Sequence, residues 1–335
     1  MFDIARGPAG ARLELFRETS MKMRLHEAII EKDFWVCCVL TTLFSSKVLA
    51  DMLIFKGGTS LSKVFNAIDR YSEDIDLVID WRELGYSKMD PWEVSNNSQR
   101  NKLIIDARTK LLSYLEKKMV PILKEELLLT LGPGIKVSLE EEVIVIEYPR
   151  AFENRAIVPR IILEIGPLAS WTPNAQYSIS PYSAENFPKA FNVPSGMVRA
   201  VTIERTFWEK ATILHQEAHR PAEKQLPARY SRHYYDVFRM TNLGFHETAI
   251  HNISLLAQAV RFKEQFYRTP WALLQEAVPG TLRLTPQPQR IASLEQDYKK
   301  MQAMIFNPDP PSFSEIISTL ESLEYRINHS CQARI

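Results

Sequence analysis

Three aspartates at even-numbered positions stand near the end of the segment FKGGTSLSKVFNAIDRYSEDIDLVID, residues 55–80. Successive side chains of a strand point to opposite faces of a sheet, so Asp74, Asp76 and Asp80 are predicted to share one face. The isoleucines and leucine between them then occupy the core face. Carboxylate oxygens are the ligands that Mg²⁺ prefers, with water and phosphate completing its shell. Asp74 and Asp76 are therefore candidate metal ligands, although a strand with a solvated acidic face would show the same pattern.

Two adjacent glycines and two hydroxyl residues precede the aspartates. Gly57 and Gly58 follow the short apolar run 52–55, a predicted strand, and Thr59 is predicted to begin a helix as its hydroxyl N-cap. Backbone N–H groups can approach an anion closely where Cβ atoms are missing, and Ser60 adds a further hydroxyl donor. The segment fits neither the Walker A pattern nor the dinucleotide pattern GxGxxG. Glycines, helix and paired carboxylates together predict a site that holds a nucleoside triphosphate with its metal ions.

The rest of the chain supplies the elements that must position these residues. Helices are predicted from apolar residues at three-to-four spacing, and strands from short β-type runs. The expected helices are 12–29, 27–46, about 101–129 (ended by the GPG at 132–134) and most of the chain after 202; the expected strands are 52–55, 142–148 and 160–165, and 166–196 is expected to be irregular or to form short edge strands. This order predicts an α+β protein with a strand-containing domain at 1–197, capped by N-terminal helices, and a helical domain at 198–335.

Composition excludes several classes of protein. Lysine and arginine number 41 against 40 acidic residues, a formal net charge of +1, so no global field draws the chain to nucleic acid or to an anionic membrane. Cys37, Cys38 and Cys331 have no metal-ligand spacing. Neither a signal-peptide run nor 18 consecutive uncharged apolar residues occurs, which predicts a cytoplasmic protein without membrane contact.

The segment KGGTSL followed by RYSEDIDL resembles the signature of the polymerase-β-type nucleotidyltransferase superfamily, and more narrowly that of the AbiEii/AbiGii (MenT-like) toxin family. IIEKDFWV at 29–36 resembles the N-terminal helix of that family. The resemblance implies a polymerase-β-like core with N-terminal helices and a C-terminal helical domain. It also implies an NTP substrate, Mg²⁺ or Mn²⁺, and a role as toxin of a bacterial toxin–antitoxin or abortive-infection pair, in phage defence.

The resemblance assigns roles to residues in both predicted domains. It implies that Asp74, Asp76, Lys210 and Asp236 are catalytic, and that a third metal-ligating carboxylate joins Asp74 and Asp76. It implies that the nucleotide contacts Lys56, Gly57, Gly58, Thr59, Ser60, Ser72 and Lys210. Ser72 lies on the face of Asp74 if strand pairing extends that far, and its hydroxyl is a candidate modification site.

Three of these assignments have alternatives on the residues alone. Glu164 is preferred over Glu147 as the third carboxylate, because a charge inside the apolar run RIILEI is costly to bury without a cation. Lys210 lies at the edge of the apolar arc of its helix, where a lysine either snorkels or reaches an anion. Asp236 would otherwise be read as a solvated helix residue.

The segment 215–239 interleaves basic residues with tyrosines, as RNA-binding surfaces do, although a solvated linker would have a similar composition. Its basic residues are His215, His219, Arg220, Lys224, Arg229, Arg232 and Arg239. The favoured hypothesis is transfer of a nucleotide from an NTP to an RNA 3′ end, with tRNA as the expected acceptor and an antitoxin as the partner protein. The alternatives are transfer to a protein hydroxyl, a GTP- or other nucleotide-binding module without transfer, and a DxD glycosyltransferase, against which the glycine segment and Lys210 argue.

Overall fold

The computed structural model describes residues 1–72, 74–86, 96–154, 157–167 and 172–329. The chain divides into two compact units, and it passes between them three times. The first unit comprises Met1–Val64 and Ser72–Val201, and the second comprises Phe65–Tyr71 and Thr202–Ile335. The short segment Phe65–Tyr71, which leads into the aspartate strand, therefore belongs to the second unit.

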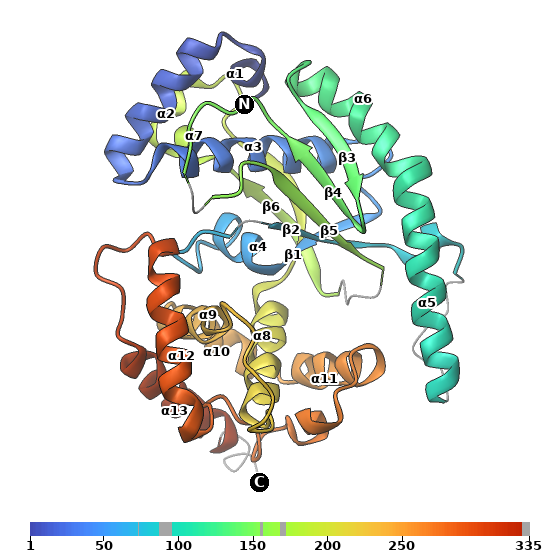
Figure 1. Cartoon of the computed structure of the whole chain (residues 1–335), viewed down its shortest axis with the longest axis vertical. Coiled ribbons are helices and arrows are strands. Elements are labelled where there is room, and N and C mark those ends of the chain that lie inside the picture. The colour runs from blue at the N-terminus through green and yellow to red at the C-terminus, as the bar shows by residue number, and fades with distance from the viewer. Residues whose placement is uncertain (73, 87–95, 155–156, 168–171, 330–335) are drawn as a thin grey trace. The chain divides into compact units, whose positions relative to one another are not determined.

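The first unit is built on a seven-stranded mixed sheet in the order β3-β4-β5-β2-β1-β7-β6 (Figure 1). β2 pairs antiparallel with β1 and parallel with β5, so it lies in the middle of the sheet. The strands are β1 (Leu53–Lys56), β2 (Asp74–Ile79), β3 (Lys136–Glu140), β4 (Val143–Glu147), β5 (Ile161–Gly166), β6 (Asn174–Ile179) and β7 (Gly196–Val201). The mixed sheet with its many helices confirms the predicted α+β class.

The two faces of the sheet differ in chemistry. One face is the hydrophobic core, to which the central strands contribute Phe55, Ile75, Leu77, Leu163 and Ala200. The pairing register sets their neighbours on the opposite face, because directly paired residues point the same way. That opposite face carries Lys56, Asp74, Asp76, Glu164 and Arg199.

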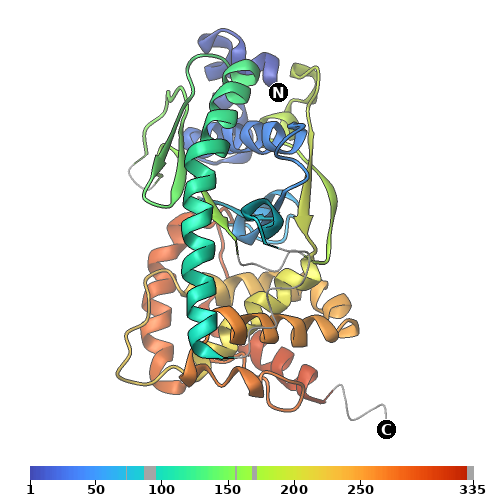
Figure 2. The same ribbon diagram turned by 90° about the vertical axis from the view of Figure 1, so that its right-hand side faces the viewer.

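Helices of the first unit bury the core face. α3 is buried along almost its whole length against the sheet, and α5 continues through a π-helical segment (115–119) into α6 as one long rod (Figure 2). The helices are α1 (Phe2–Arg6), α2 (Ala9–Met23), α3 (Glu27–Ser45), α4 (Gly57–Lys63), α5 (Asn97–Tyr114), α6 (Val120–Leu131) and α7 (Tyr182–Asn186). Gly132, with φ +91°, ends the rod where the glycine-rich signal predicted.

Three strands were missed or only partly expected from the sequence. β3 is a short strand with exposed charged ends, and β6 is a largely polar strand at the edge of the sheet. β7 begins at the last residue of the stretch 166–196, which was expected to be irregular or to form short edge strands, and no element was predicted for residues 197–201. It is the apolar partner of β1, and this pairing joins residues more than 140 positions apart, which local patterns do not record.

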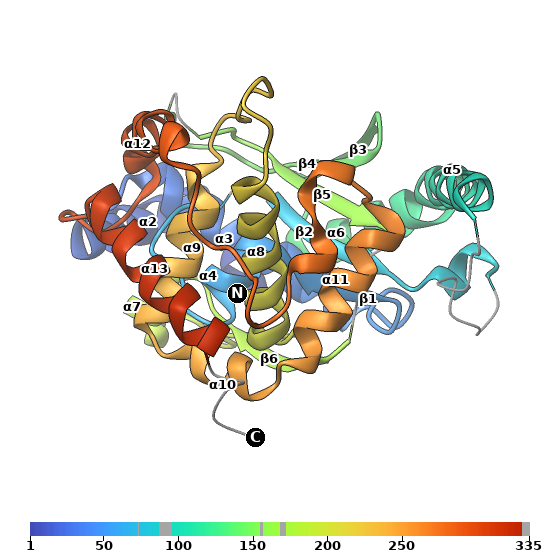
Figure 3. The same cartoon turned by 90° about the horizontal axis from the view of Figure 1, so that it is seen from below.

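The second unit is helical. Figure 3 shows α8 at its centre, with α9, α10 and α11 around it, and α12 and α13 pack on α9. Trp208 of α8 is fully buried, and its indole Nε1 donates to the carbonyl of Ala249 at 3.0 Å. The helices are α8 (Ile203–Ala218), α9 (Ser231–Asn242), α10 (Phe245–His251), α11 (Ser254–Phe266), α12 (Pro288–Met301) and α13 (Phe313–His329).

The described part of the chain was searched for membrane-spanning helices and for cysteine pairing. No helix within it is both long and apolar enough to cross a membrane. Cys37 and Cys38 are buried free thiols within α3, and Cys331 lies outside the described residues.

Candidate active site

The paired aspartates occupy the centre of the sheet. Asp74 and Asp76 both lie on β2, two residues apart and therefore on the same face, with their side chains partly exposed. Asp76 pairs with Lys56 of β1 on one side and with Glu164 of β5 on the other. The register thus lines up one lysine and two carboxylate residues across three neighbouring strands.

Gly57 makes room for the Asp76 carboxylate. It has φ +80°, a left-handed conformation that L side chains rarely adopt. A Cβ atom at this position would lie 1.8 Å from Oδ2 and 2.6 Å from Cγ of Asp76. Any side chain at position 57 would therefore displace the carboxylate. The first glycine of the motif is explained by its packing against the aspartate.

The hydroxyl groups of Thr59 and Ser60 form hydrogen bonds within the protein, at the turn between β1 and α4. α4 begins at Gly57 with Lys56 as its N-cap residue, so the prediction that Thr59 is a hydroxyl N-cap is wrong. Thr59 and Ser60 are buried in the first turns of the helix. The Thr59 hydroxyl donates to the carbonyl of Asp74 at 2.5 Å, and that of Ser60 donates to the carbonyl of Gly57 at 2.9 Å. These two bonds fix the glycine turn and join it to the aspartate strand, while Gly58 lies between them and is partly exposed.

The position of Glu164 differs from that of Glu147. Glu164 is paired with Asp76, whereas Glu147 ends β4, is exposed and forms an ion pair with Lys136 at 3.7 Å. The register therefore favours Glu164. The prediction that the Glu164 charge is buried within its apolar strand is wrong, because the side chain is exposed and carries no burial cost. Among the described residues, no three His, Cys, Asp or Glu side chains are gathered closely enough to form a metal centre.

Two residues assigned to the aspartate strand lie outside it. β2 begins at Asp74, so strand pairing does not extend to Ser72, whose side chain is partly exposed. β2 ends at Ile79, and Asp80 caps the 3₁₀ helix Trp81–Leu84 by accepting from the backbone N–H of Arg82 at 2.9 Å. The carboxylates on the strand itself are thus Asp74 and Asp76.

Three consecutive charged residues of α3, Glu31, Lys32 and Asp33, are buried, and each contacts a different segment of the first unit. Glu31 accepts from the backbone N–H groups of residues 151 and 152, and Lys32 donates to the carbonyl of residue 158 at 2.9 Å. Asp33 accepts from the backbone N–H of Tyr182 at 2.6 Å and forms an ion pair with Lys63. Buried charges within an otherwise apolar helix require such partners, so three consecutive charges in an apolar helix are a sequence signal for long-range contacts.

The ion pair between Asp33 and Lys63 anchors α4. Lys63 Nζ lies 2.7 Å from Asp33 Oδ1 and 3.9 Å from the centre of the Tyr182 ring, and both charged side chains are buried. Burial alone would lower the pKa of Lys63, but the neighbouring Asp33 carboxylate outweighs it and raises the pKa above its ordinary value. This pair therefore holds the C-terminal end of α4, whose first turn contacts Asp76.

Breaking this buried pair should destabilise the first unit. Asp33→Asn leaves the Lys63 ammonium buried without its anion, so the free energy of unfolding should fall by about 3 kcal/mol. The double variant Asp33→Leu with Lys63→Met removes both charges and should recover most of the loss. Urea denaturation measures both effects. Glu142→Gln, which breaks an exposed pair with Arg108, is the control and should change stability by less than about 1 kcal/mol; equal losses for the two single variants would contradict the anchoring role.

The second unit contains a buried charge cluster around Asp236. Arg70 binds both carboxylate oxygens of Asp236, at 2.7 and 2.8 Å, and Lys210 Nζ lies 2.9 Å from Oδ2. Lys210 Nζ also lies 3.3 Å from Nδ1 of His233. Burial alone would raise the pKa of Asp236, but the charges of Arg70 and Lys210 outweigh it and hold the pKa below its ordinary range. Asp236 is therefore an ionised carboxylate held between two cations.

This cluster excludes one alternative for each of its two predicted members. Asp236 is fully buried, so it is not a solvated helix residue, and Lys210 is 9% exposed and paired, so it does not snorkel. Burial lowers the pKa of Lys210, which the Asp236 carboxylate opposes. Arg70, six residues before Asp76 in the motif, was not identified from the sequence because nothing local marks its partner 166 positions away.

The basic segment 215–239 is less exposed than expected. Arg220 is buried and binds both carboxylate oxygens of Glu217, and His215 is fully buried with its ring bonded to the backbone of residues 273 and 283. Burial lowers the pKa of His215 to about 4. Arg239 pairs with Asp69 at 2.6 Å. Within this segment the exposed basic residues are Lys224, Arg229 and Arg232; the half-buried His219 donates from Nδ1 to the backbone carbonyl of residue 215 in its own helix.

Comparison with models of known protein families shows which family the chain belongs to. A family model described as "Nucleotidyl transferase AbiEii toxin, Type IV TA system" matches residues 38–319, most of the sequence. The chain belongs to this family. It is therefore a nucleotidyltransferase toxin of a type IV toxin–antitoxin system, and the suspected family resemblance is confirmed.

The chain was also compared with solved structures and with curated proteins. A solved structure of MenT4, a nucleotidyltransferase toxin from Mycobacterium tuberculosis H37Rv, aligns with 92% of this chain and 93% of its own chain, at 16% identity and a TM-score of 0.44. A search of the curated proteins found no match.

Proposed function

We propose that this AbiEii-family enzyme transfers a nucleotide from an NTP to the 3′ end of an RNA, with tRNA as the acceptor. The observation that carries the proposal is the packing of the glycine turn against the aspartate strand: Gly57 leaves space for the Asp76 carboxylate, and Thr59 is bonded to the backbone of Asp74. The family membership supplies the reaction class, and this arrangement supports Asp74 and Asp76 as its central residues.

The donor set fits a divalent cation. Asp74 and Asp76 offer carboxylate oxygens on one face, and Gly57 provides the space in which the Asp76 carboxylate sits. Mg²⁺ or Mn²⁺ needs few protein ligands when phosphate and water supply the rest, so these two aspartates would hold it. Glu164 is proposed as a third ligand, which requires its exposed side chain to turn toward the aspartates, because the three carboxylates are not clustered in the structure. When bound, the ion neutralises charge on the triphosphate and favours ionisation of the attacking hydroxyl.

The proposed transfer is balanced in atoms and charge. A ribose hydroxyl at the RNA 3′ end attacks the α-phosphorus of the NTP, and an O–P bond forms as the bond from that phosphorus to the β-phosphate oxygen breaks. Pyrophosphate leaves, and the hydroxyl proton passes to water. Lys56, aligned beside Asp76, and the turn from Gly57 to Ser60 are proposed to contact the nucleotide. Lys210 is proposed to contact phosphate on the strength of the family motif.

Incubation of the purified protein with each labelled NTP, Mg²⁺ and total tRNA tests the proposal. Label should appear in RNA and be removed by a 3′ exonuclease. Label in protein instead would establish transfer to a protein hydroxyl. Binding of an NTP without any transfer would leave a nucleotide-binding module, and either result would overturn the RNA proposal.

The exposed basic residues of segment 215–239 define a proposed RNA-binding surface, formed by Lys224, Arg229 and Arg232. Changing all three to Ala should weaken RNA binding and flatten its salt dependence, because each lost phosphate contact removes released counterions. The slope of log affinity against log salt should fall by about 2–3, measured by fluorescence anisotropy. Lys117, Lys118 and Lys124, exposed residues of the first unit, give a control with the same change of charge when replaced by Ala. An unchanged slope in the first variant, or an equal change in both, would contradict the surface. Arg220 is unsuitable for this test because it is buried and paired.

A further inference from the structure

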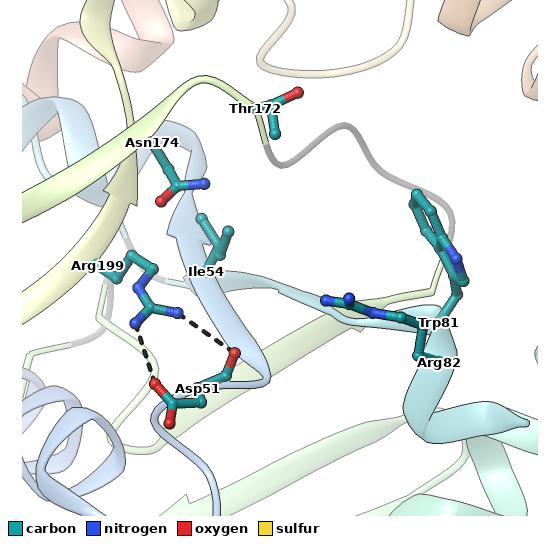
Figure 4. Close-up of a pocket in the computed structure, with 7 residues that line it drawn as sticks. All are labelled: Asp51, Ile54, Trp81, Arg82, Thr172, Asn174 and Arg199. Atoms are coloured by element: carbon teal, nitrogen blue, oxygen red, sulfur yellow. Dashed lines mark hydrogen bonds and ion pairs between the residues drawn. The ribbon is translucent and has the colours of Figure 1, made fainter. Parts of the chain in front are cut away.

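A second feature on the carboxylate face of the sheet has no assigned role. It is a pocket of about 370 Å³ in the first unit (Figure 4). Its lining combines an indole ring, an aliphatic side chain, an amide, a hydroxyl and two guanidinium groups. The lining residues are Asp51, Ile54, Trp81, Arg82, Thr172, Asn174 and Arg199.

The pairing register places this pocket next to the aspartates. Ile54 lies two residues before Lys56 on β1, so both point to the same face, and it pairs with Val78 just as Lys56 pairs with Asp76. Alternate residues of a strand are about 6–7 Å apart. Arg199 lies on the same face, because its neighbour Ala200 pairs with Phe55 of the core face. Ile54, the pocket residue on β1, therefore lies about 6–7 Å along the strand from the level of Asp76.

The charges of the pocket are balanced. Arg199 donates to a carboxylate oxygen of Asp51 at 3.1 Å and to its backbone carbonyl at 3.3 Å. The Arg82 Nε lies 2.7 Å from Oδ2 of Asp80. Each guanidinium is thus paired with a carboxylate, so the two arginines add no net positive charge to the lining. Such a pocket suits a neutral planar ligand more than a phosphate.

The uncharged part of the lining supports the same ligand class. Trp81 and Ile54, which are 8% and 4% exposed, supply the apolar part of the lining, and flat heteroaromatic rings pack against apolar side chains. Asn174 carries both a hydrogen-bond donor and an acceptor, the combination that reads the edge of a nucleobase. Figure 4 shows the Arg82 guanidinium extending from its turn toward Ile54 and Asn174, with the Trp81 ring on the opposite side of the pocket.

We propose that this pocket binds a nucleobase and that Asn174 helps to decide which base is accepted. The proposal rests on the proposed function, because it takes the ribose and phosphate of the same nucleotide to lie toward Asp76. The base belongs either to the incoming NTP or to the terminal nucleotide of the acceptor RNA. Both sources present the same chemistry, and they are separated by experiment.

The test compares Asn174→Ala with Gln176→Ala. Gln176 is an exposed residue two positions along the same strand, on the same face and outside the pocket, so it is a matched control. The values of kcat/KM are measured for the four NTPs with one acceptor, and for acceptors that differ only in their terminal base with one NTP. In one of the two series, Asn174→Ala should reduce the ratio between the highest and the lowest kcat/KM by about tenfold. This is the effect of one lost hydrogen bond of about 1.4 kcal/mol. Gln176→Ala should leave both series unchanged.

The two series of kcat/KM values show which base the pocket binds, or that it binds neither. A reduced spread among the NTPs assigns it to the incoming base, and a reduced spread among the acceptors assigns it to the terminal base. Unchanged spreads in both series, or equal changes in the control, overturn the proposal. If the wild type transfers nothing to RNA, the proposed function fails by itself. The pocket is then tested by equilibrium dialysis of the four NTPs, in which Asn174→Ala should weaken the best-bound NTP about tenfold relative to the control, and equal binding by both variants overturns the proposal.

Discussion

Asp76→Asn should abolish nucleotide transfer while leaving the fold intact. Asparagine has almost the same volume as aspartate, so the space left by Gly57 still accommodates it. The change removes one negative charge at the proposed metal site, which weakens ion binding and transition-state stabilisation together. We expect kcat to fall by at least about 10²–10³-fold, the effect of losing one preorganised electrostatic contact. Single-turnover transfer with labelled NTP measures the loss.

The same variant tests the toxin activity in cells. Expression of the wild type without its antitoxin should slow bacterial growth, and Asp76→Asn should not. Asp309→Asn, the same chemical change at an exposed position of the second unit, is the control and should remain active and toxic. Wild-type turnover by Asp76→Asn would remove Asp76 from the site. Loss of turnover together with loss of the far-UV circular dichroism signal would show instead that the charge is needed for folding.

The carboxylate face could be predicted from the sequence because its information is local. Strand alternation alone placed Asp74 and Asp76 on one face, and the order of strand, glycines, helix and strand gave their surroundings. The reason for the glycine was not local. Gly57 is needed because a strand 17 residues later brings Asp76 within 2 Å of where its Cβ would be. Propensity and periodicity describe a residue's neighbours in sequence, and they carry no information on such approaches.

The partners of the buried charges show the same limit. The sequence marks Glu31, Lys32 and Asp33 as three charges in an apolar helix, so it predicts that they need partners without saying which. Their partners lie 120 to 149 positions away, except Lys63. The prediction that the basic segment 215–239 is exposed was partly wrong, for a related reason. Its composition suggested a surface, but burial is decided by packing against segments later in the chain: Leu273 and Arg283 bond the His215 ring, and Arg220 packs over the Trp271 ring.

Asp236→Asn should destabilise the second unit more than any other single change considered. The side chain is fully buried between Arg70 and Lys210, and asparagine would leave two buried cations beside a neutral amide. Removing one member of a buried ionic network costs about 3–5 kcal/mol, and we expect the upper end because both remaining charges have the same sign. Urea denaturation measures the loss. Asp69→Asn, which breaks the partly exposed pair with Arg239, is the matched control and should cost less than about 1 kcal/mol.

A second substitution decides whether Asp236 acts on the reaction or holds other residues in place. Adding Arg70→Gln to Asp236→Asn removes one of the two buried cations, so the double variant should regain part of the lost stability. If Asp236 only positions Lys210, transfer activity should return in proportion to the folded protein, with a raised KM for NTP because Lys210 is less well held. If stability returns and kcat remains at the level of the single variant, the carboxylate takes part in the chemical step. A single variant as stable as the wild type would contradict the buried ionic network itself.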